Sequence, residues 1–205
     1  MPAPVAIAQP IASEDQARSD VYALLARLFA DGPDATLLAA IARAERMDAA
    51  HAAIGEKWNR LVDASSVMDP DAAQQEYTDL FIGVGKSEVN LHASFWLSGF
   101  MMERPLASLR SQLSELGIAR HDQVAMLEDH LSALCETMRL LIAGDAERVP
   151  AALATQRAFF ERYLASWVFD CCAAIGKSAI ANYYVHVAEF ARDFMAIDRE
   201  ALAMD

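Results

Sequence analysis

Three consecutive polar residues, Glu128, Asp129 and His130, form the group in this sequence best suited to chemistry. They interrupt an apolar stretch whose spacing of three and four residues predicts one helix from residue 123 to Ala143 (Val124, Leu127, Leu131, Leu134, Met138, Leu141). On that helix His130 would border the apolar stripe, and Asp129 would point largely away from it. An imidazole at such a border titrates near neutrality and can donate to, or accept from, a bound peptide. The alternative is structural, with His130 a satisfied boundary residue and Asp129 a charge favoured near a helix start.

The motifs of the common enzyme classes are missing from the sequence. No histidine follows a Glu or Asp by three residues on a convincing inward face, as a di-metal site would need. There is no nucleophile elbow, Walker loop or Cys-x-x-Cys pair, and Gly83-Val84-Gly85 lacks the third glycine of a dinucleotide fingerprint. The sequence therefore predicts a protein without catalytic residues or a cofactor. A nucleotide hydrolase using His130 with Glu128 or Asp129 is the enzymatic alternative.

A second informative stretch runs from residue 76 to residue 109. Asp69-Pro70 predicts a helix start, and Tyr77, Leu80 and Phe81 then share one face until glycines end the helix. Ser94 opens a further amphipathic segment that is rich in aromatic residues and methionine, including Trp96 and Phe100. Adaptable apolar surfaces of this kind suit peptide binding. The same stripes are equally typical of a buried core.

Composition predicts a single all-α domain, a bundle of roughly nine helices over residues 13–205 behind a disordered tail at 1–12. The chain has 205 residues, 55% of them hydrophobic, and no long stretch alternates with period two. Particular predictions are a capping box over 13–16, a helix over 34–47, and a helix that starts near Pro150 and reaches Trp167. The last long helix is predicted from Ser178, followed by a short C-terminal helix.

Charge and cysteine content restrict the partners and the compartment. The formal net charge is −12, and the sequence shows no basic patch of the kind that nucleic-acid binding needs, whereas an acidic surface suits a basic partner. Three cysteines, two of them adjacent, argue against a disulfide framework. The N-terminus lacks the basic residues of a signal peptide, and no apolar run is long enough for a membrane span, so a cytoplasmic protein is predicted. A monomer and a domain-swapped dimer both remain open.

Taken in order along the chain, several motifs resemble those of the TorD/DmsD/NarJ-like redox-enzyme maturation chaperones. The family's Glu/Tyr/Leu-Phe signature, which ends near a glycine, is similar to residues 76–83, and its Ser-plus-aromatic segment to residues 93–100. Its Glu-x-Pro-Leu and Leu-Gly-Ile motifs match residues 103–106 and 116–118. Its Pro-Glu-Asp-His motif corresponds to residues 127–130, with Leu127 in place of proline.

This resemblance implies an all-helical, cofactor-free chaperone that binds the precursor of a molybdopterin oxidoreductase catalytic subunit. The bound part would be its twin-arginine signal peptide, another region, or both, held until cofactor insertion is complete and export can begin. The implied peptide site has Glu128 and Asp129 facing the arginines and His130 lining a pocket, with mostly apolar residues and Ser94 shaping a groove (Tyr77, Leu80, Phe81, Ser94, Trp96, Phe100, Leu127). A helical scaffold or regulator in which these residues are only structural is the remaining alternative.

Overall fold

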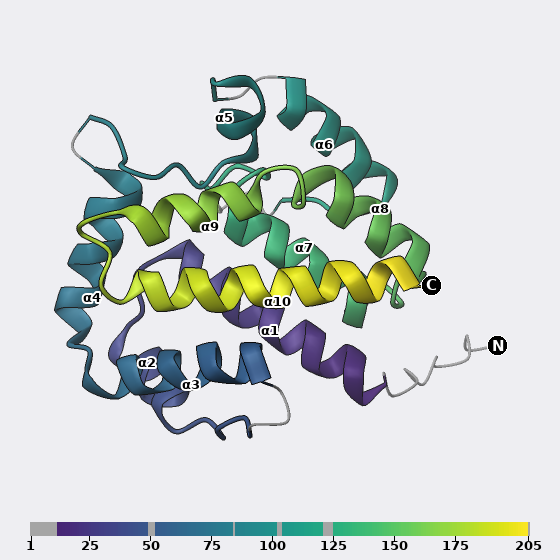
Figure 1. The fold of residues 1–205 in the computed structure, drawn as a ribbon. Helices are drawn as coiled ribbons and strands as arrows, with labels where there is room; N and C mark the ends of the chain where they lie inside the picture. The colour runs from purple at the N-terminus through teal and green to yellow at the C-terminus, as the bar shows by residue number, and fades with distance from the viewer. Residues whose placement is uncertain (1–11, 49–51, 84, 102–103, 121–124, 205) are drawn as a thin grey trace.

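The computed structural model describes residues 12–48, 52–83, 85–101, 104–120 and 125–204. Within them the chain forms one all-α domain without strands, as predicted (Figure 1). Ten α-helices and one π-helical turn make up the described part, against the roughly nine helices expected. They are α1 Ser13–Ala30, α2 Ala35–Ala42, α3 Ala52–Val67, α4 Pro70–Tyr77, η2 Thr78–Ile82, α5 Ala93–Ser98, α6 Arg104–Glu115, α7 Leu131–Ala143, α8 Leu153–Tyr163, α9 Val168–Lys177 and α10 Tyr184–Met204.

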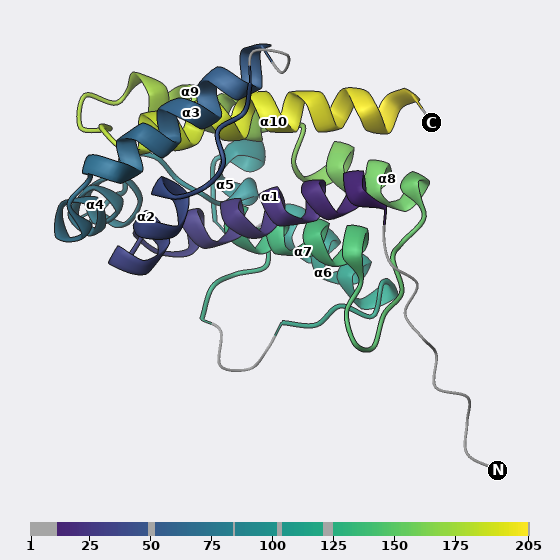
Figure 2. The ribbon, with the colours of Figure 1, turned by 90° about the horizontal axis from the view of Figure 1, so that it is seen from below.

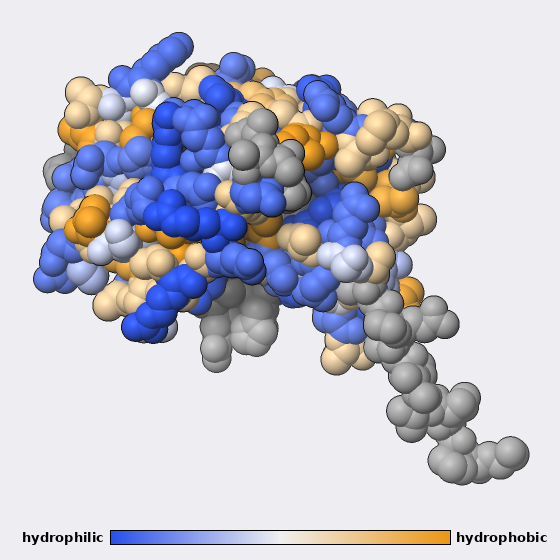
Figure 3. Space-filling model, turned by 60° about the horizontal axis from the view of Figure 1, so that its bottom comes forward, coloured by the Kyte–Doolittle hydropathy of each residue, from blue (hydrophilic) through white to orange (hydrophobic). Residues whose placement is uncertain are grey.

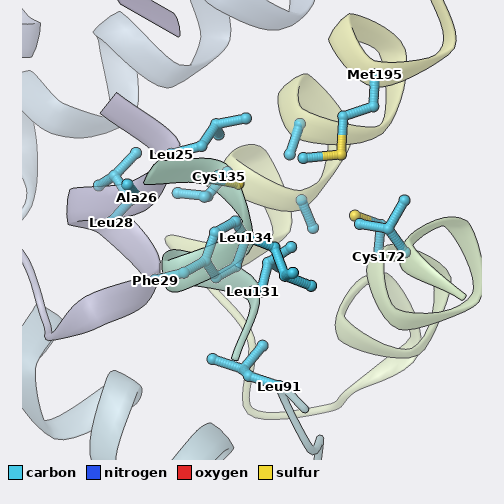
Figure 4. Packing of buried hydrophobic residues seen from close by; sticks show 14 of the residues in the cluster. Leu25, Ala26, Leu28, Phe29, Leu91, Leu131, Leu134, Cys135, Cys172 and Met195 are labelled. Atoms are coloured by element: carbon cyan, nitrogen blue, oxygen red, sulfur yellow. The ribbon is translucent and has the colours of Figure 1, made fainter. Parts of the chain in front are cut away.

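The core lies between α1 and α7 on one side and α9 and α10 on the other. Helix α1 packs along α7, and α10 lies beside α9 and α3, as both ribbon views show (Figure 1, Figure 2). Apolar side chains of all four helices fill the space between them (Figure 4). Leu25 and Phe29 of α1 meet Leu134 of α7, while Cys172 of α9 and Met195 of α10 close the far side, all of them buried.

The predicted N-terminal capping box does not form. Ala12 is the N-cap of α1, Ser13 is already helical, and no side chain caps this end. On the buried face of the helix, Tyr22 is fully buried and donates its hydroxyl hydrogen to Asp198 of α10 at 2.7 Å. Residues 1–11 of the predicted tail lie outside the described residues.

The second predicted helix is shorter than expected because α3 holds the following segment in a non-helical path. Asp34 caps α2 as a helix start should, yet the helix ends at Ala42 rather than near Met47. The Asn59 side chain binds both the amide and the carbonyl of Met47, and the Trp58 indole donates to the carbonyl of Glu45. These side chains occupy the backbone groups that a longer helix would have paired.

The C-terminal third is divided differently from the prediction. Pro150 precedes α8 instead of lying in its first turn, and Trp167 lies buried in the connection to α9. Residues 178–183 are not helical, and a single helix then runs from Tyr184 to Met204 in place of two. The carboxylate of Glu76 fixes this start, since it accepts hydrogen bonds from the amides of residues 182, 183 and 184 at 2.8–3.0 Å.

The molecular surface is more polar than the composition as a whole, of which 55% is hydrophobic, because apolar residues gather in the core. On the face shown in Figure 3, hydrophilic residues predominate and hydrophobic ones form separate patches. Among the described residues, no helix is both long enough and apolar enough to cross a bilayer.

Candidate functional site

The Glu128–His130 triplet does not lie inside a helix, contrary to the prediction. Helix α7 begins only at Leu131, and His130 is its N-cap, with its Nδ1 accepting a hydrogen bond from the amide of Ser132 at 3.2 Å. The triplet is instead an irregular turn that precedes the helix. Val124 of the predicted stripe lies outside the described residues, whereas Leu131, Leu134, Met138 and Leu141 are buried as expected.

Asp129 is buried and joins the turn to α5, so the expectation that it points away from the core is wrong. His92 and His130 form an antiparallel bridge, in which the amide of Ala93 donates to the carbonyl of Asp129 and the amide of Leu131 to the carbonyl of Leu91. The Asp129 carboxylate also accepts a hydrogen bond from the amide of Ser94 at 2.9 Å. Helix α5 has no cap from its own residue 92, so this carboxylate satisfies its first turn from outside.

Two buried polar atoms beside this contact have no hydrogen-bond partner. They are Oδ1 of Asp129 and Oγ of Ser94. Asp129 is only 1% exposed, and Ser94 is fully buried. A buried carboxylate with one free oxygen stabilises a positive charge placed nearby, because it is weakly screened by solvent.

His130 packs against His92, with the rings edge to face and their centroids 4.8 Å apart. Burial, and to a smaller extent the neighbouring His92, lower the pKa of His130 to about 3. Burial also lowers the pKa of His92, against an opposing effect of Asp129. Both imidazoles are therefore neutral at pH 7, and His130 is not the neutral-pH titrating group that the sequence suggested.

Asn90 holds the segment before α5 in place. Its side-chain oxygen accepts from the amide of His92 at 2.8 Å, and its backbone carbonyl accepts from the indole of Trp96 at 2.7 Å. The Trp96 ring also stacks on the buried ring of Trp167. Trp96 is thus half-buried, and one face of its ring packs against the core.

The predicted groove residues of α4 and η2 lie in the core. Tyr77, Leu80 and Phe81 are all buried, and the Tyr77 hydroxyl donates to the carbonyls of Phe29 and Ala30. The structure separates them from the exposed apolar residues at the end of α5. Of the predicted set, Phe100 is the one most open to solvent, 69% exposed, beside the partly exposed Leu97 and Met101.

Glu128 lies next to Asp129 but faces outward, and it is paired with arginines of the same chain. One carboxylate oxygen accepts from Nε and Nη2 of Arg110 at 3.0 and 2.9 Å. The other lies 3.7 Å from Nε of Arg120. Burial raises the pKa of Glu128, but the hydrogen bond from Arg110, a backbone hydrogen bond and the charges of Arg110 and Arg120 together outweigh it, so the net shift is downward.

A pocket of about 330 Å³ opens beside Glu128, between α7, the end of α6 and the segment that follows it. Most of its lining is apolar, and the carboxylates of Glu128 and Glu136 belong to it (Ala30, Leu113, Ile118, Ala119, Arg120, Met126, Glu128, Ser132, Ala133, Glu136, Thr137, Leu140). Of the predicted site residues, only Glu128 is among them. Sequence reasoning missed Arg110, Arg120 and Glu136. Arg120 and Glu136 lie near the Leu127–His130 motif in the sequence, whereas Arg110, 18 positions before Glu128, carried no signal.

No group of three or more metal-ligating side chains comes together in the part of the chain that the structure describes. The three cysteines, Cys135, Cys171 and Cys172, are free and buried. Burial raises the pKa of each thiol, so none is a reactive thiolate at neutral pH.

Comparison with known families identifies the class of protein. The family model described as "Nitrate reductase delta subunit" matches residues 47–173, which include η2, α5, the Glu128–His130 turn and every pocket residue except Ala30. The chain therefore belongs to the nitrate reductase delta subunit family. This is a NarJ/TorD-like family of redox-enzyme maturation chaperones, not a catalytic family, and its members bind nitrate reductase-type molybdoenzyme subunits. No curated protein matches the chain.

Proposed function

We propose that this chaperone binds the twin-arginine leader of a molybdopterin oxidoreductase catalytic subunit in the cytoplasm and delays export until the cofactor is inserted. The observation that carries the proposal is the pocket beside Glu128. An apolar lining with carboxylates in it matches a peptide in which paired arginines precede an apolar stretch.

In this proposal the residues of the Leu127–His130 motif have different roles. Glu128 receives an arginine directly, because its carboxylate lines the pocket. Asp129 acts at a distance, through the charge of its unpartnered oxygen and through its hold on α5. His130 positions both by capping α7.

The exposed apolar end of α5 offers a second contact for the leader's hydrophobic part. Leu97, Phe100 and Met101 are all exposed and lie within five residues of one another in the chain. Several exposed apolar residues at one place mark an interaction site more often than single ones do. Gly99, in the left-handed conformation, ends the helix and leads the chain to Phe100.

Calorimetric titration with a synthetic leader peptide tests the proposal, with a twin-lysine peptide as control. Micromolar binding is expected, and the lysine peptide should bind several-fold more weakly because lysine cannot make two parallel hydrogen bonds to one carboxylate. Glu128→Gln should reduce the affinity and its dependence on salt together. Equal binding of both peptides, or none to leaders of several molybdoenzymes, would refute recognition of the arginine pair.

A further inference from the structure

Two guanidinium groups of the chain itself meet at the carboxylate of Glu128. Arg110 comes from α6 and binds one oxygen through two nitrogens, and Arg120, from the segment after α6, approaches the other. A third contact, from Nη1 of Arg120 to the carbonyl of Met126, holds Arg120 across the turn at 3.3 Å. The chain thus places a pair of arginines where the proposed function places the arginines of the client.

The carboxylate of Glu128 is much less exposed to solvent than the two arginines that bind it. The Glu128 side chain is 14% exposed, whereas those of Arg110 and Arg120 are 49% and 37% exposed. Exposed ion pairs contribute little net free energy and exchange readily, because each arginine regains water and side-chain freedom on leaving. The carboxylate would therefore accept another guanidinium without a change in the fold.

The local charge changes with each arginine that leaves. Glu128 with both arginines carries a net charge of about +1, which opposes the approach of a basic peptide. With one arginine displaced the group is neutral, and with both displaced it is negative. The chain's own arginines therefore lower the affinity of this carboxylate for any external one.

We propose that Arg110 and Arg120 are internal competitors of the client's arginine pair, and that they set the affinity of the leader site at a level that permits release. This inference rests on the proposed function. Leader binding exchanges the guanidinium groups on Glu128, and the client's release is completed when Arg110 and Arg120 return. The two arginines are thus affinity-determining residues that oppose binding, although they lie at the binding site.

Titration of Arg110→Gln, Arg120→Gln and the double variant with the twin-arginine peptide tests this inference. Each single variant should bind two- to fivefold more tightly than the parent, and the double variant about tenfold, which corresponds to about 1.4 kcal/mol. On a Glu128→Gln background the same substitutions should have no effect, because the contested carboxylate is gone. Circular dichroism checks that each variant keeps its helices.

Arg199→Gln is the matched control. Arg199 of α10 makes a comparable two-nitrogen pair with Glu161 at 2.7 and 2.9 Å, and its loss changes the net charge equally. An equal gain in affinity in this control would overturn the inference, since net charge alone would then explain it. Unchanged or weaker binding by the Arg110 and Arg120 variants would also overturn the inference. If the parent protein still binds the leader in that case, the proposed function stands. Failure of the parent and of every variant to bind would overturn both.

Discussion

Acid should destabilise this protein through His130, and the structure sets the size of the effect. The imidazole is buried against His92 and beside Asp129, and its pKa falls from 6.5 to about 3 on folding. A histidine with a lowered folded pKa contributes stability above its unfolded pKa and loses it as the pH falls, because the unfolded chain then binds the extra proton. The loss should run from about pH 6.5 down to about pH 3.

Between pH 7.5 and pH 5 the loss attributable to His130 is ~2 kcal/mol, since pH 5 lies about 1.5 units below the unfolded pKa. Urea unfolding of the parent and of His130→Asn at both pH values measures it. Asparagine is a good N-cap residue and does not titrate, so the variant keeps the cap of α7 and removes only the proton. The parent should lose ~2 kcal/mol more than the variant. An equal loss in both proteins would refute the assignment of a buried neutral imidazole at this position.

Three further predictions, each with its own substitutions, test other parts of the structure. Glu76→Ala should lower the free energy of unfolding by about 2 kcal/mol, because three backbone amides at the start of α10 lose a charged acceptor. The control Asp79→Ala loses only one exposed contact with Gln75 and should change the free energy of unfolding by less than about 0.5 kcal/mol. Asp198→Asn should cost about 2 kcal/mol in the same urea assay, since the partly buried Arg18 guanidinium loses the more buried of its two charged partners and keeps Asp15, and a loss below about 1 kcal/mol would contradict that account. Phe100→Ala should weaken leader binding at least threefold without a measurable change in stability, and unchanged affinity would remove the end of α5 from the binding surface. Trp96→Ala should instead cost about 2 kcal/mol of stability, because the indole contacts Asn90 and Trp167.

Local signals in the sequence were sufficient for many element boundaries. Asp69 caps α4 with Pro70 in the first turn, as its residue types predict, and its side chain accepts from the amide of Ala72. Gly83 ends η2 with a positive φ of 64°, and a Cβ there would collide with the carbonyl of Lys86. These features depend on residues a few positions apart, which is the range over which sequence patterns act.

The site could not be predicted in the same way, because its contacts join distant parts of the chain. The role of Asp129 depends on the amide of Ser94, 35 positions away, and Glu128 meets Arg110, 18 positions away. Helical periodicity alone placed Asp129 outside the core, since it gave no reason to begin α7 only at Leu131. The sequence singled out the Leu127–His130 motif, but which of its residues lines the pocket required the tertiary structure.

Photo-crosslinking of a leader peptide tests the location of the binding site most directly. The peptide carries a photoreactive residue directly after the arginine pair, and the adducts are located by mass spectrometry. We predict adducts on pocket residues such as Leu113, Ala133 and Leu140, suppressed by an excess of unlabelled twin-arginine peptide and weaker with a twin-lysine peptide. Adducts confined to α3 and α10, equally strong with either peptide, would contradict recognition of the client at the Glu128 pocket.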